Sequence, residues 1–75
     1  MRLKQLRRER NISQLKLAMD LGINQNTVSR YETGAYEADY GMLIKLADYF
    51  DVSIDYLLGR TDDPRLNRST PPRAN

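Results

Sequence analysis

Four polar side chains share one side of the segment that runs from residue 24 to residue 34. Gln25, Asn26, Ser29 and Arg30 recur at helical spacing, and all four carry hydrogen-bonding groups. A Gln or Asn amide can pair bidentately with adenine, and an Arg guanidinium can pair with guanine in the same way. Ser29 is a weaker candidate, because a hydroxyl is ambiguous in base readout. These residue types permit base recognition, although a merely hydrated helix surface has a similar composition.

The distribution of charge along the chain favours a polyanion as the partner of this segment. Residues 1–30 carry seven Lys or Arg and two Asp or Glu, whereas residues 31–59 carry one and six. Residues 60–75 add four Arg and two Asp. Lys and Arg next to phosphates release condensed counterions, so a basic first half suits nucleic-acid binding. A solvated basic helix face is the alternative interpretation of the same charges.

The composition excludes several kinds of chemistry. The chain has no Cys and no His, which removes disulfides, thiolate or imidazole metal sites, and nucleophiles activated by His. Acidic pairs such as Asp48 with Asp51 lie on outer helix positions, and 75 residues leave no obvious substrate cleft. No apolar run approaches the roughly 20 residues that span a bilayer. We therefore expect a soluble, cytoplasmic protein that is not an enzyme and has no metal, cofactor or small-molecule ligand.

Apolar residues recur with the period of an α-helix throughout residues 1–59, and no strand pattern or internal repeat is present. The sequence therefore predicts an all-α fold, a compact bundle of five short helices whose inner faces carry Leu3, Leu6, Ile12, Leu17, Ala18, Leu21, Ile23, Val28, Tyr31, Leu43, Ile44, Leu46, Ala47 and Phe50. The last helix has Ile54, Leu57 and Leu58 as its apolar residues, and the pattern leaves open whether Leu57 and Leu58 close the core or form a dimer seam. Residues 60–75 contain all three Pro residues and no periodicity. This composition predicts a flexible basic C-terminal tail after a domain of residues 1–59.

Capping residues indicate where the helices begin and end. N-cap residues, whose side chains accept a free N–H group of the first turn, are predicted at Ser13, Asn24, Asp39 and Ser53. Helix ends that need positive φ are predicted at Gly22, Gly34 and Gly59. The first helix should end near Asn11. Residues 14–31 then form a helix, a turn of about four residues and a second helix, with Ala18 small where the two helices cross.

These motifs, in this order and at this spacing, resemble the Cro/cI-type helix-turn-helix family, also described as xenobiotic-response-element-like or lambda repressor-like. The resemblance covers residues 3–59, and the matching segments are residues 6–7, 12–14, 17–18, 21–23, 27–32, 34, 46–47 and 52–59. It implies that the second and third helices form the helix-turn-helix, and that the third helix lies in the major groove of DNA. Gln25, Asn26 and Arg30 would then contact base edges, with Ser29 beside them.

The resemblance also implies roles for residues around the third helix. It assigns contacts with the DNA backbone to four polar side chains, Gln14, Asn24, Thr27 and Tyr36. For Asn24, helix capping is expected ahead of phosphate binding. Arg7 and Glu32 match the family's ion pair between the first and third helices, which is a scaffold role. Glu37, in the following loop, would be repelled by a DNA phosphate.

These observations predict sequence-specific binding of double-stranded DNA by a small transcriptional regulator, with repression favoured over activation. Members of the family commonly bind DNA as dimers through their C-terminal helices, which implies a homodimer on a palindromic operator. The alternative is a helix-turn-helix protein-interaction module, such as an antitoxin or an adaptor, that uses Leu15, Tyr40, Met42 or residues 56–58. The amide and guanidinium groups of the third helix favour DNA over an apolar protein partner.

Overall fold

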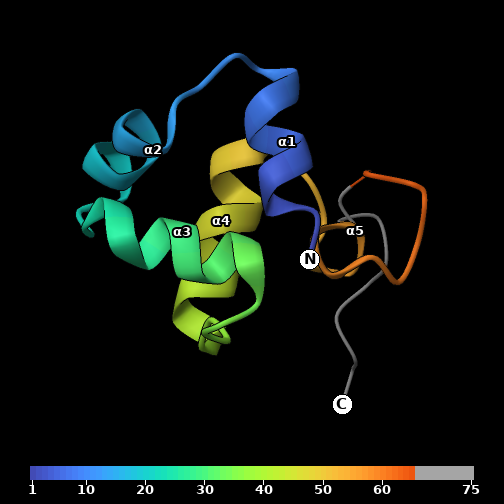
Figure 1. Cartoon of the computed structure of the whole chain (residues 1–75). Helices are drawn as coiled ribbons and strands as arrows, with labels where there is room; N and C mark the ends of the chain where they lie inside the picture. Colours follow the sequence, from blue (N-terminus) through green and yellow to red (C-terminus); the bar gives the residue numbers. More distant parts are fainter. Residues whose placement is uncertain (66–75) are drawn as a thin grey trace.

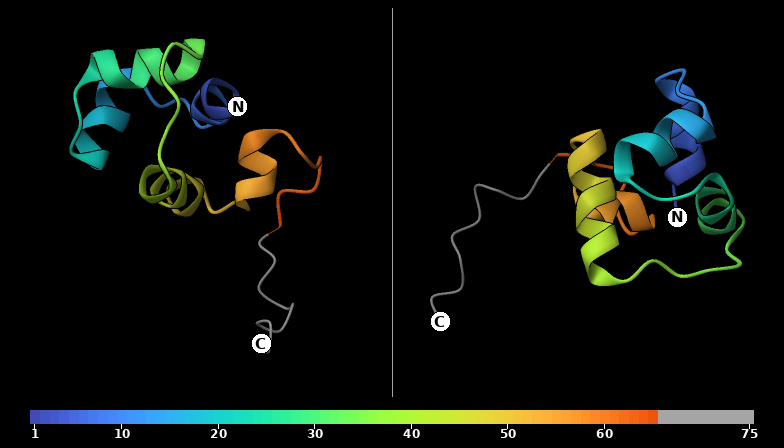
Figure 2. Two further views of the ribbon diagram at one scale, coloured as in Figure 1. Left: turned by 90° about the horizontal axis from the view of Figure 1, so that it is seen from below. Right: turned by 90° about the vertical axis from the view of Figure 1, so that its left-hand side faces the viewer.

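The computed structural model describes residues 1–65, and that part of the chain contains five α-helices and no strand (Figure 1). The helices are α1 (Leu3–Glu9), α2 (Gln14–Leu21), α3 (Gln25–Thr33), α4 (Tyr40–Phe50) and α5 (Ile54–Leu58). In Figures 1 and 2, α2 and α3 lie on one side of the molecule and α5 on the other, with α1 and α4 between them. The predicted all-α fold of five short helices is confirmed. The predicted tail comprises residues 60–75, and its residues 66–75 lie outside the described residues.

The helices of the chain begin where side-chain oxygens can accept free N–H groups. Four of them begin after a side chain that accepts the N–H group of the residue three positions later, at 2.9 to 3.1 Å, in Ser13, Asn24, Asp39 and Ser53. The first helix has no side-chain cap. Instead, the N–H group of Arg2 donates to the carbonyl oxygen of Leu57 at 2.7 Å, which joins the start of α1 to α5. All four predicted N-caps are therefore confirmed.

The helix ends combine the predicted glycines with Asn11, near which the first helix was predicted to end, and with Asp51, which the pattern did not indicate. Positive φ angles of 72°, 84° and 85° occur at Gly22, Gly34 and Gly59. Asn11 and Asp51 also adopt positive φ, at 56° and 55°, which their short polar side chains tolerate. The first helix ends at Glu9, two residues before Asn11, as predicted. The reversal at Asn11 lets the N–H group of Ile12 donate to the carbonyl oxygen of Arg7 at 3.1 Å.

The core gathers side chains from every helix. Its buried residues are Leu3, Leu6, Leu17, Ala18, Val28, Leu46, Ala47, Phe50, Val52 and Leu57. Ile44, which was predicted to be inside, is instead exposed. On α5, Leu57 is buried whereas Ile54 and Leu58 are exposed. A helix with apolar residues on most sides, as α4 has, does not show by its period which side faces inward. Val52, which joins α4 to α5, is buried although the helical pattern did not include it.

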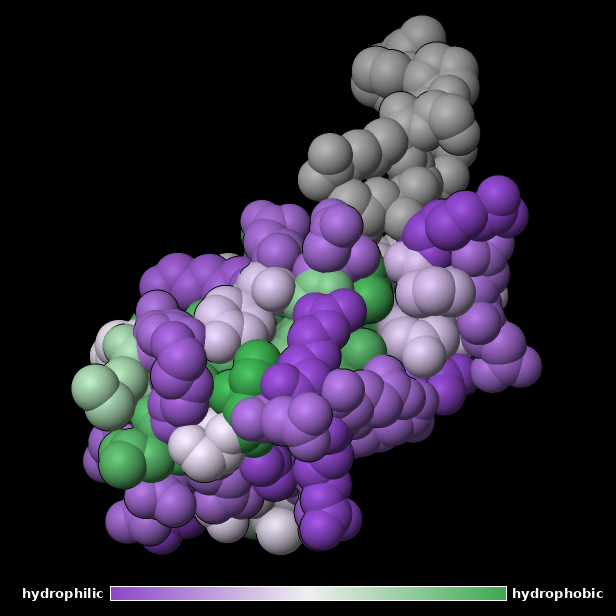
Figure 3. Space-filling view, turned by 90° about the horizontal axis from the view of Figure 1, so that it is seen from above, coloured by the Kyte–Doolittle hydropathy of each residue, from purple (hydrophilic) through white to green (hydrophobic). Residues whose placement is uncertain are grey.

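Apolar side chains also remain on the surface of α2. Leu15 and Met19 are exposed, the latter at 71% of its area, and they lie one turn apart on this helix. The face drawn in Figure 3 is mostly hydrophilic, with apolar groups at the left, where α2 lies, and near the middle. Leu15 and Met19 are not among the buried core residues and are available for contact with another molecule.

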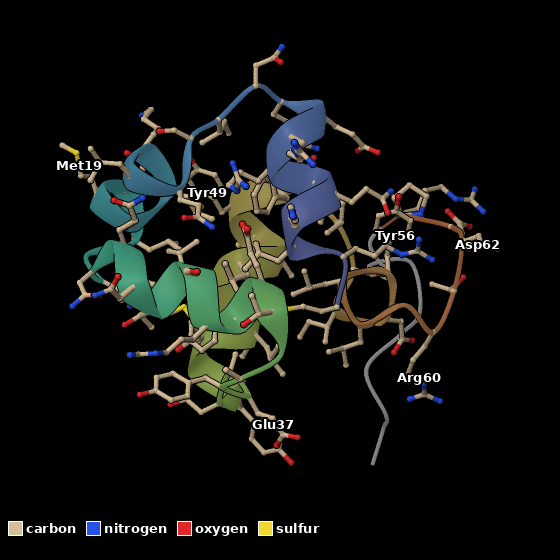
Figure 4. All side chains as sticks on the ribbon, viewed as in Figure 1. Met19, Glu37, Tyr49, Tyr56, Arg60 and Asp62 are labelled. Carbon is tan, nitrogen blue, oxygen red and sulfur yellow. The ribbon has the colours of Figure 1, made fainter. Side chains whose placement is uncertain are left out.

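The first residues of the predicted tail are hydrogen-bonded to the helices. Arg2 donates from Nη2 to the carbonyl oxygen of Thr61 at 3.0 Å and to Oδ1 of Asp62 at 2.9 Å. The N–H group of Ser53 donates to the carbonyl oxygen of Pro64 at 3.0 Å. Figure 4 shows Asp62 on the same side of the molecule as Tyr56 of α5. Residues 60–65 are therefore held to the helices, because Arg2 and the N–H group of Ser53 donate to them. The apolar pattern of the sequence did not indicate these contacts.

Candidate nucleic-acid interface

The third helix presents three of the four predicted base-contact residues to solvent. Gln25, Asn26 and Arg30 are exposed, whereas Ser29 is half-buried. The opposite side of the helix is fixed by Val28, which is fully buried in the core. α3 also packs against both α1 and α2. The result is a fixed helix with two amides and a guanidinium on its outer face, the groups that can pair with base edges.

A buried ion pair joins α3 to α1. Nε of Arg7 lies 2.6 Å from Oε2 of Glu32, and Nη2 of Arg7 lies 3.2 Å from Oε1. The two side chains are 12% and 2% exposed, and Arg7 also donates from Nη1 to the carbonyl oxygen of Ile12 at 2.8 Å. The structure thus brings Arg7 and Glu32 together as the sequence predicted, with a bidentate geometry that orients both side chains.

Gln14 extends this polar network to the first predicted base-contact residue. Its Nε2 donates to Oε1 of Glu32 at 3.0 Å, and its Oε1 accepts from Nε2 of Gln25 at 3.4 Å. The contact with Glu32 fixes which end of the Gln14 amide is the donor. A predicted DNA-backbone residue and a predicted base-contact residue therefore touch each other. The sequence carried no signal for this, because neither contact follows from spacing within one helix.

Asn24 and Thr27 form the start of α3. Oδ1 of Asn24 accepts from the N–H group of Thr27 at 3.1 Å and from its hydroxyl at 3.4 Å. Helix capping, which was expected ahead of phosphate binding for Asn24, is the role that this oxygen has in the structure. The amide nitrogen of Asn24 is not used in these bonds. Both residues stay at the helix N-terminus, where N–H groups favour an anion.

The loop after α3 folds back against Arg30. The guanidinium carbon of Arg30 lies 5.1 Å from the centroid of the Tyr36 ring, and Nη1 lies 3.4 Å from the Tyr36 hydroxyl. Tyr36 is exposed, and Glu37 extends away from the helices in Figure 4. The structure thereby groups Tyr36, a predicted backbone contact, with Arg30, a predicted base contact, and the sequence did not indicate that they meet.

A second polar cluster links α2 to α4. The hydroxyl of Tyr49 donates to Oδ2 of Asp20 at 2.5 Å, and Nζ of Lys16 lies 2.9 Å from the same oxygen. The hydrogen bond from Tyr49, followed by that from Lys16, lowers the pKa of Asp20. The same hydrogen bonds raise the pKa values of Tyr49 and Lys16, since the carboxylate favours their protonated forms. Lys16 is therefore already paired, although it belongs to the basic first half of the chain.

Neither a metal-binding group nor a membrane-spanning helix is found in the described part of the chain. Residues 1–65 contain no group of three or more side chains suited to hold a metal ion. None of the helices in this range is long and apolar enough to cross a membrane.

A family model described as Helix-turn-helix matches residues 3–57. The chain belongs to the Cro/cI-type helix-turn-helix family. This helix-turn-helix chain is 40% identical over 63 residues to the uncharacterized HTH-type transcriptional regulator YobD of Bacillus subtilis (strain 168), a match that covers 84% of the chain and 56% of YobD. The resemblance inferred from the sequence motifs is therefore confirmed.

Two further helix-turn-helix relatives differ in how much of their length is matched. HTH-type transcriptional regulator ImmR of Bacillus subtilis (strain 168) is 35% identical over 68 residues, which are 91% of this chain and 54% of ImmR. The uncharacterized HTH-type transcriptional regulator MJ0272 of Methanocaldococcus jannaschii is 32% identical over 62 residues, 83% of this chain and 94% of MJ0272. The chain thus spans about half the length of its Bacillus relatives. No solved structure gave a significant match.

Proposed function

We propose that this chain binds double-stranded DNA in a sequence-specific manner and acts as a small transcriptional regulator, with repression favoured over activation. The third helix enters the major groove, and Gln25, Asn26 and Arg30 contact base edges, with Ser29 in a lesser role. The observation that carries the proposal is the exposure of these amide and guanidinium groups on a helix whose other side is buried. The names of the relatives, which describe transcriptional regulators, support it.

Contacts with the DNA backbone complete the proposed interface. Gln14 and Thr27 lie at the starts of α2 and α3, where helix N–H groups attract phosphates. Asn24 offers its amide nitrogen, since its oxygen caps α3. Tyr36 offers a hydroxyl from the loop beyond α3. Such contacts position a helix in the groove but do not read sequence.

We further propose that the chain binds a palindromic operator as a homodimer through its C-terminal helix. Leu57 is buried in the core, whereas Ile54 and Leu58 on α5 are exposed. Leu58 lines an open hollow of about 380 Å³ together with Met1 and Leu43. Met1 and Leu58, which are exposed, and the half-buried Leu43 give this hollow apolar groups that suit a second copy of the same surface, because a two-fold interface is self-complementary.

Selection from a random duplex library tests both proposals. Enrichment of an inverted repeat with half-sites about 34 Å apart would support a dimeric, sequence-specific DNA-binding protein. Enrichment of a single short site would retain DNA recognition and refute the palindromic operator. The absence of any enriched sequence would refute sequence-specific binding.

Arg30→Ala then tests the assignment of α3. Arg30 is exposed, so its removal should spare the fold, cost about 1 to 3 kcal/mol at the selected operator and relax one base pair per half-site. Lys45→Ala, which removes an exposed positive charge from α4, is the matched control and should not change base choice. An equal loss of affinity for every duplex in Arg30→Ala would show that Arg30 contacts the DNA backbone and not a base.

The second candidate function is a protein-interaction module, and the exposed Leu15 and Met19 favour it. These side chains lie on α2, and Figure 4 shows Met19 on the outer side of that helix. Leu15→Ser with Met19→Ser should leave operator affinity unchanged if DNA is the partner. Failure of the parent chain to select any duplex, together with a protein partner lost in this double variant, would favour the second candidate.

A further inference from the structure

The loop after α3 contacts Arg30 twice. Beyond Gly34, which has a φ of 84°, the N–H group of Tyr36 donates to the carbonyl oxygen of Arg30 at 3.2 Å. The Tyr36 ring then lies beside the guanidinium, with 5.1 Å between the ring centroid and the guanidinium carbon. The backbone bond holds the loop beside Arg30, and the ring lies against the Arg30 side chain.

The character of this contact suits a base-reading arginine. An aromatic face attracts the guanidinium without neutralising its charge, whereas a carboxylate would occupy its donors. Within residues 1–65, the ion pairs of the structure do not include Arg30. The single hydrogen bond to the Tyr36 hydroxyl uses Nη1 at 3.4 Å. A guanidinium has five N–H donors in one plane, so donors on its edge remain for a guanine.

We propose that Tyr36 is a positioning residue for Arg30, and that discrimination at the base pair contacted by Arg30 depends on the Tyr36 ring. The proposal rests on the proposed function, since it assigns Arg30 to a base. An arginine on an exposed helix surface samples many rotamers, and ordering them weakens binding. A ring that restricts the rotamers of Arg30 before DNA binds reduces the conformational entropy lost when Arg30 pairs with the correct base pair.

Three variants separate the ring from the hydroxyl. Tyr36→Phe keeps the ring and removes the hydroxyl, which is also the group proposed to contact a phosphate. Tyr36→Leu removes the ring while leaving the backbone bond to Arg30. Tyr36 is 49% exposed, and both variants should therefore keep the helical circular dichroism spectrum of the parent. Arg30→Ala supplies the reference for the base pair concerned.

The contact itself is measured by NMR without DNA. Ring-current shifts of the Arg30 side-chain protons should be present in the parent and in Tyr36→Phe, and absent in Tyr36→Leu. Shifts that are equal in all three proteins would overturn the proposal, whatever the chain binds. This measurement separates a failure of the positioning role from a failure of the proposed DNA binding.

Discrimination is measured by competition binding of the selected operator against duplexes altered at one base pair. Tyr36→Leu should lower the preference about 3- to 10-fold at the base pair that Arg30→Ala relaxes, because one side chain must be ordered on binding. It should have no further effect on that preference in the Arg30→Ala background. Tyr36→Phe should keep the preference and weaken all duplexes alike.

The control is Gln25→Ala, which alters a base contact at the other end of α3. Its effect should add to that of Tyr36→Leu, because Gln25 touches Gln14 and not Tyr36. Equal weakening of all duplexes by Tyr36→Leu, or additive effects of Tyr36→Leu and Arg30→Ala, would overturn the positioning role while leaving DNA binding intact. A parent chain with no sequence preference would overturn both proposals.

Discussion

Replacing Glu32 with alanine should destabilise the fold more than any change to a surface charge. The carboxylate is 2% exposed and accepts from Nε and Nη2 of Arg7 and from Nε2 of Gln14. Its removal leaves the guanidinium of Arg7, itself only 12% exposed, without a counter-charge. Gln14 loses the acceptor that orients its amide.

The magnitude follows from the burial of the charge that remains. Breaking a buried pair by removing one partner costs about 3 to 5 kcal/mol. Arg7 keeps its bond to the carbonyl oxygen of Ile12 at 2.8 Å and retains some access to water, so we expect about 3 kcal/mol. A chain of this length has about 4 to 11 kcal/mol of total stability, so the variant should keep about 1 to 8 kcal/mol and remain folded.

Urea unfolding followed by circular dichroism at neutral pH measures this loss. Glu32→Gln, which keeps an acceptor and the side-chain shape, should lose less. Arg7→Met combined with Glu32→Leu should lose less than Glu32→Ala alone, because no buried charge is left unpaired. The control Lys16→Met breaks the exposed pair with Asp20, and its effect should weaken in high salt. A Glu32→Ala variant within about 1 kcal/mol of the parent would refute the reasoning.

Three further predictions concern packing, the Arg2 contacts and pH. Ala18→Leu should cost about 1 to 3 kcal/mol by overpacking, because Ala18 is 1% exposed, and an unchanged thermal melt would contradict the close helix crossing. Arg2→Ala should lower the free energy of unfolding in urea by about 1 to 3 kcal/mol. Arg2 donates to the carbonyl oxygens of Tyr56 at 2.8 Å and Thr61 at 3.0 Å, and both bonds are lost. Full stability of Arg2→Lys would show that the positive charge alone, without these bonds, accounts for the effect. The pKa of Asp20 lies below its ordinary value of 3.8, so its contacts stabilise the fold above that pH, and the contribution is lost as pH falls through the folded value. Tyr49→Phe should therefore be less stable than the parent at about pH 7, and this difference should shrink as pH falls below 3.8. A difference that stays constant over this range would contradict the assignment.

Local chemistry accounts for most of the fold that the sequence predicted. The N-caps depend on a side-chain oxygen and an N–H group three residues later, and the helix ends depend on a residue that tolerates positive φ. Both requirements are satisfied within a few residues of chain. Asp51 was missed because Asp is less typical than Gly at such a position, although its φ of 55° ends α4 in the same way.

Contacts between distant segments were not predictable by the same means. The exposure of Ile44 depends on which side of α4 meets the other helices, and the apolar residues of α4 do not distinguish the sides. Residues 60–65 looked like a tail because proline and polar residues lack periodicity. Their attachment depends on Arg2, which lies 59 positions from Thr61. Composition carries no information about such pairs.

The candidate site shows the same division between local and distant information. Helical spacing was enough to place Gln25, Asn26 and Arg30 on one outer face, and the structure has them exposed. Spacing could not show that Gln25 touches Gln14, or that Arg30 touches Tyr36. The Arg7 and Glu32 pair was predicted only through the family resemblance, because a charged residue in a short helix is ordinarily taken as exposed.

Residues that fix α3 and residues proposed to contact bases occupy different positions of one helix. Val28 and Glu32 are turned toward the other helices, whereas Gln25, Asn26 and Arg30 are turned outward. Substitutions of the first group should therefore change the free energy of unfolding, and substitutions of the second should change base preference with little effect on stability. A short domain can in this way vary its operator without changing its core. Gln14 is where the two groups meet, because its amide bonds to Glu32 on one side and to Gln25 on the other.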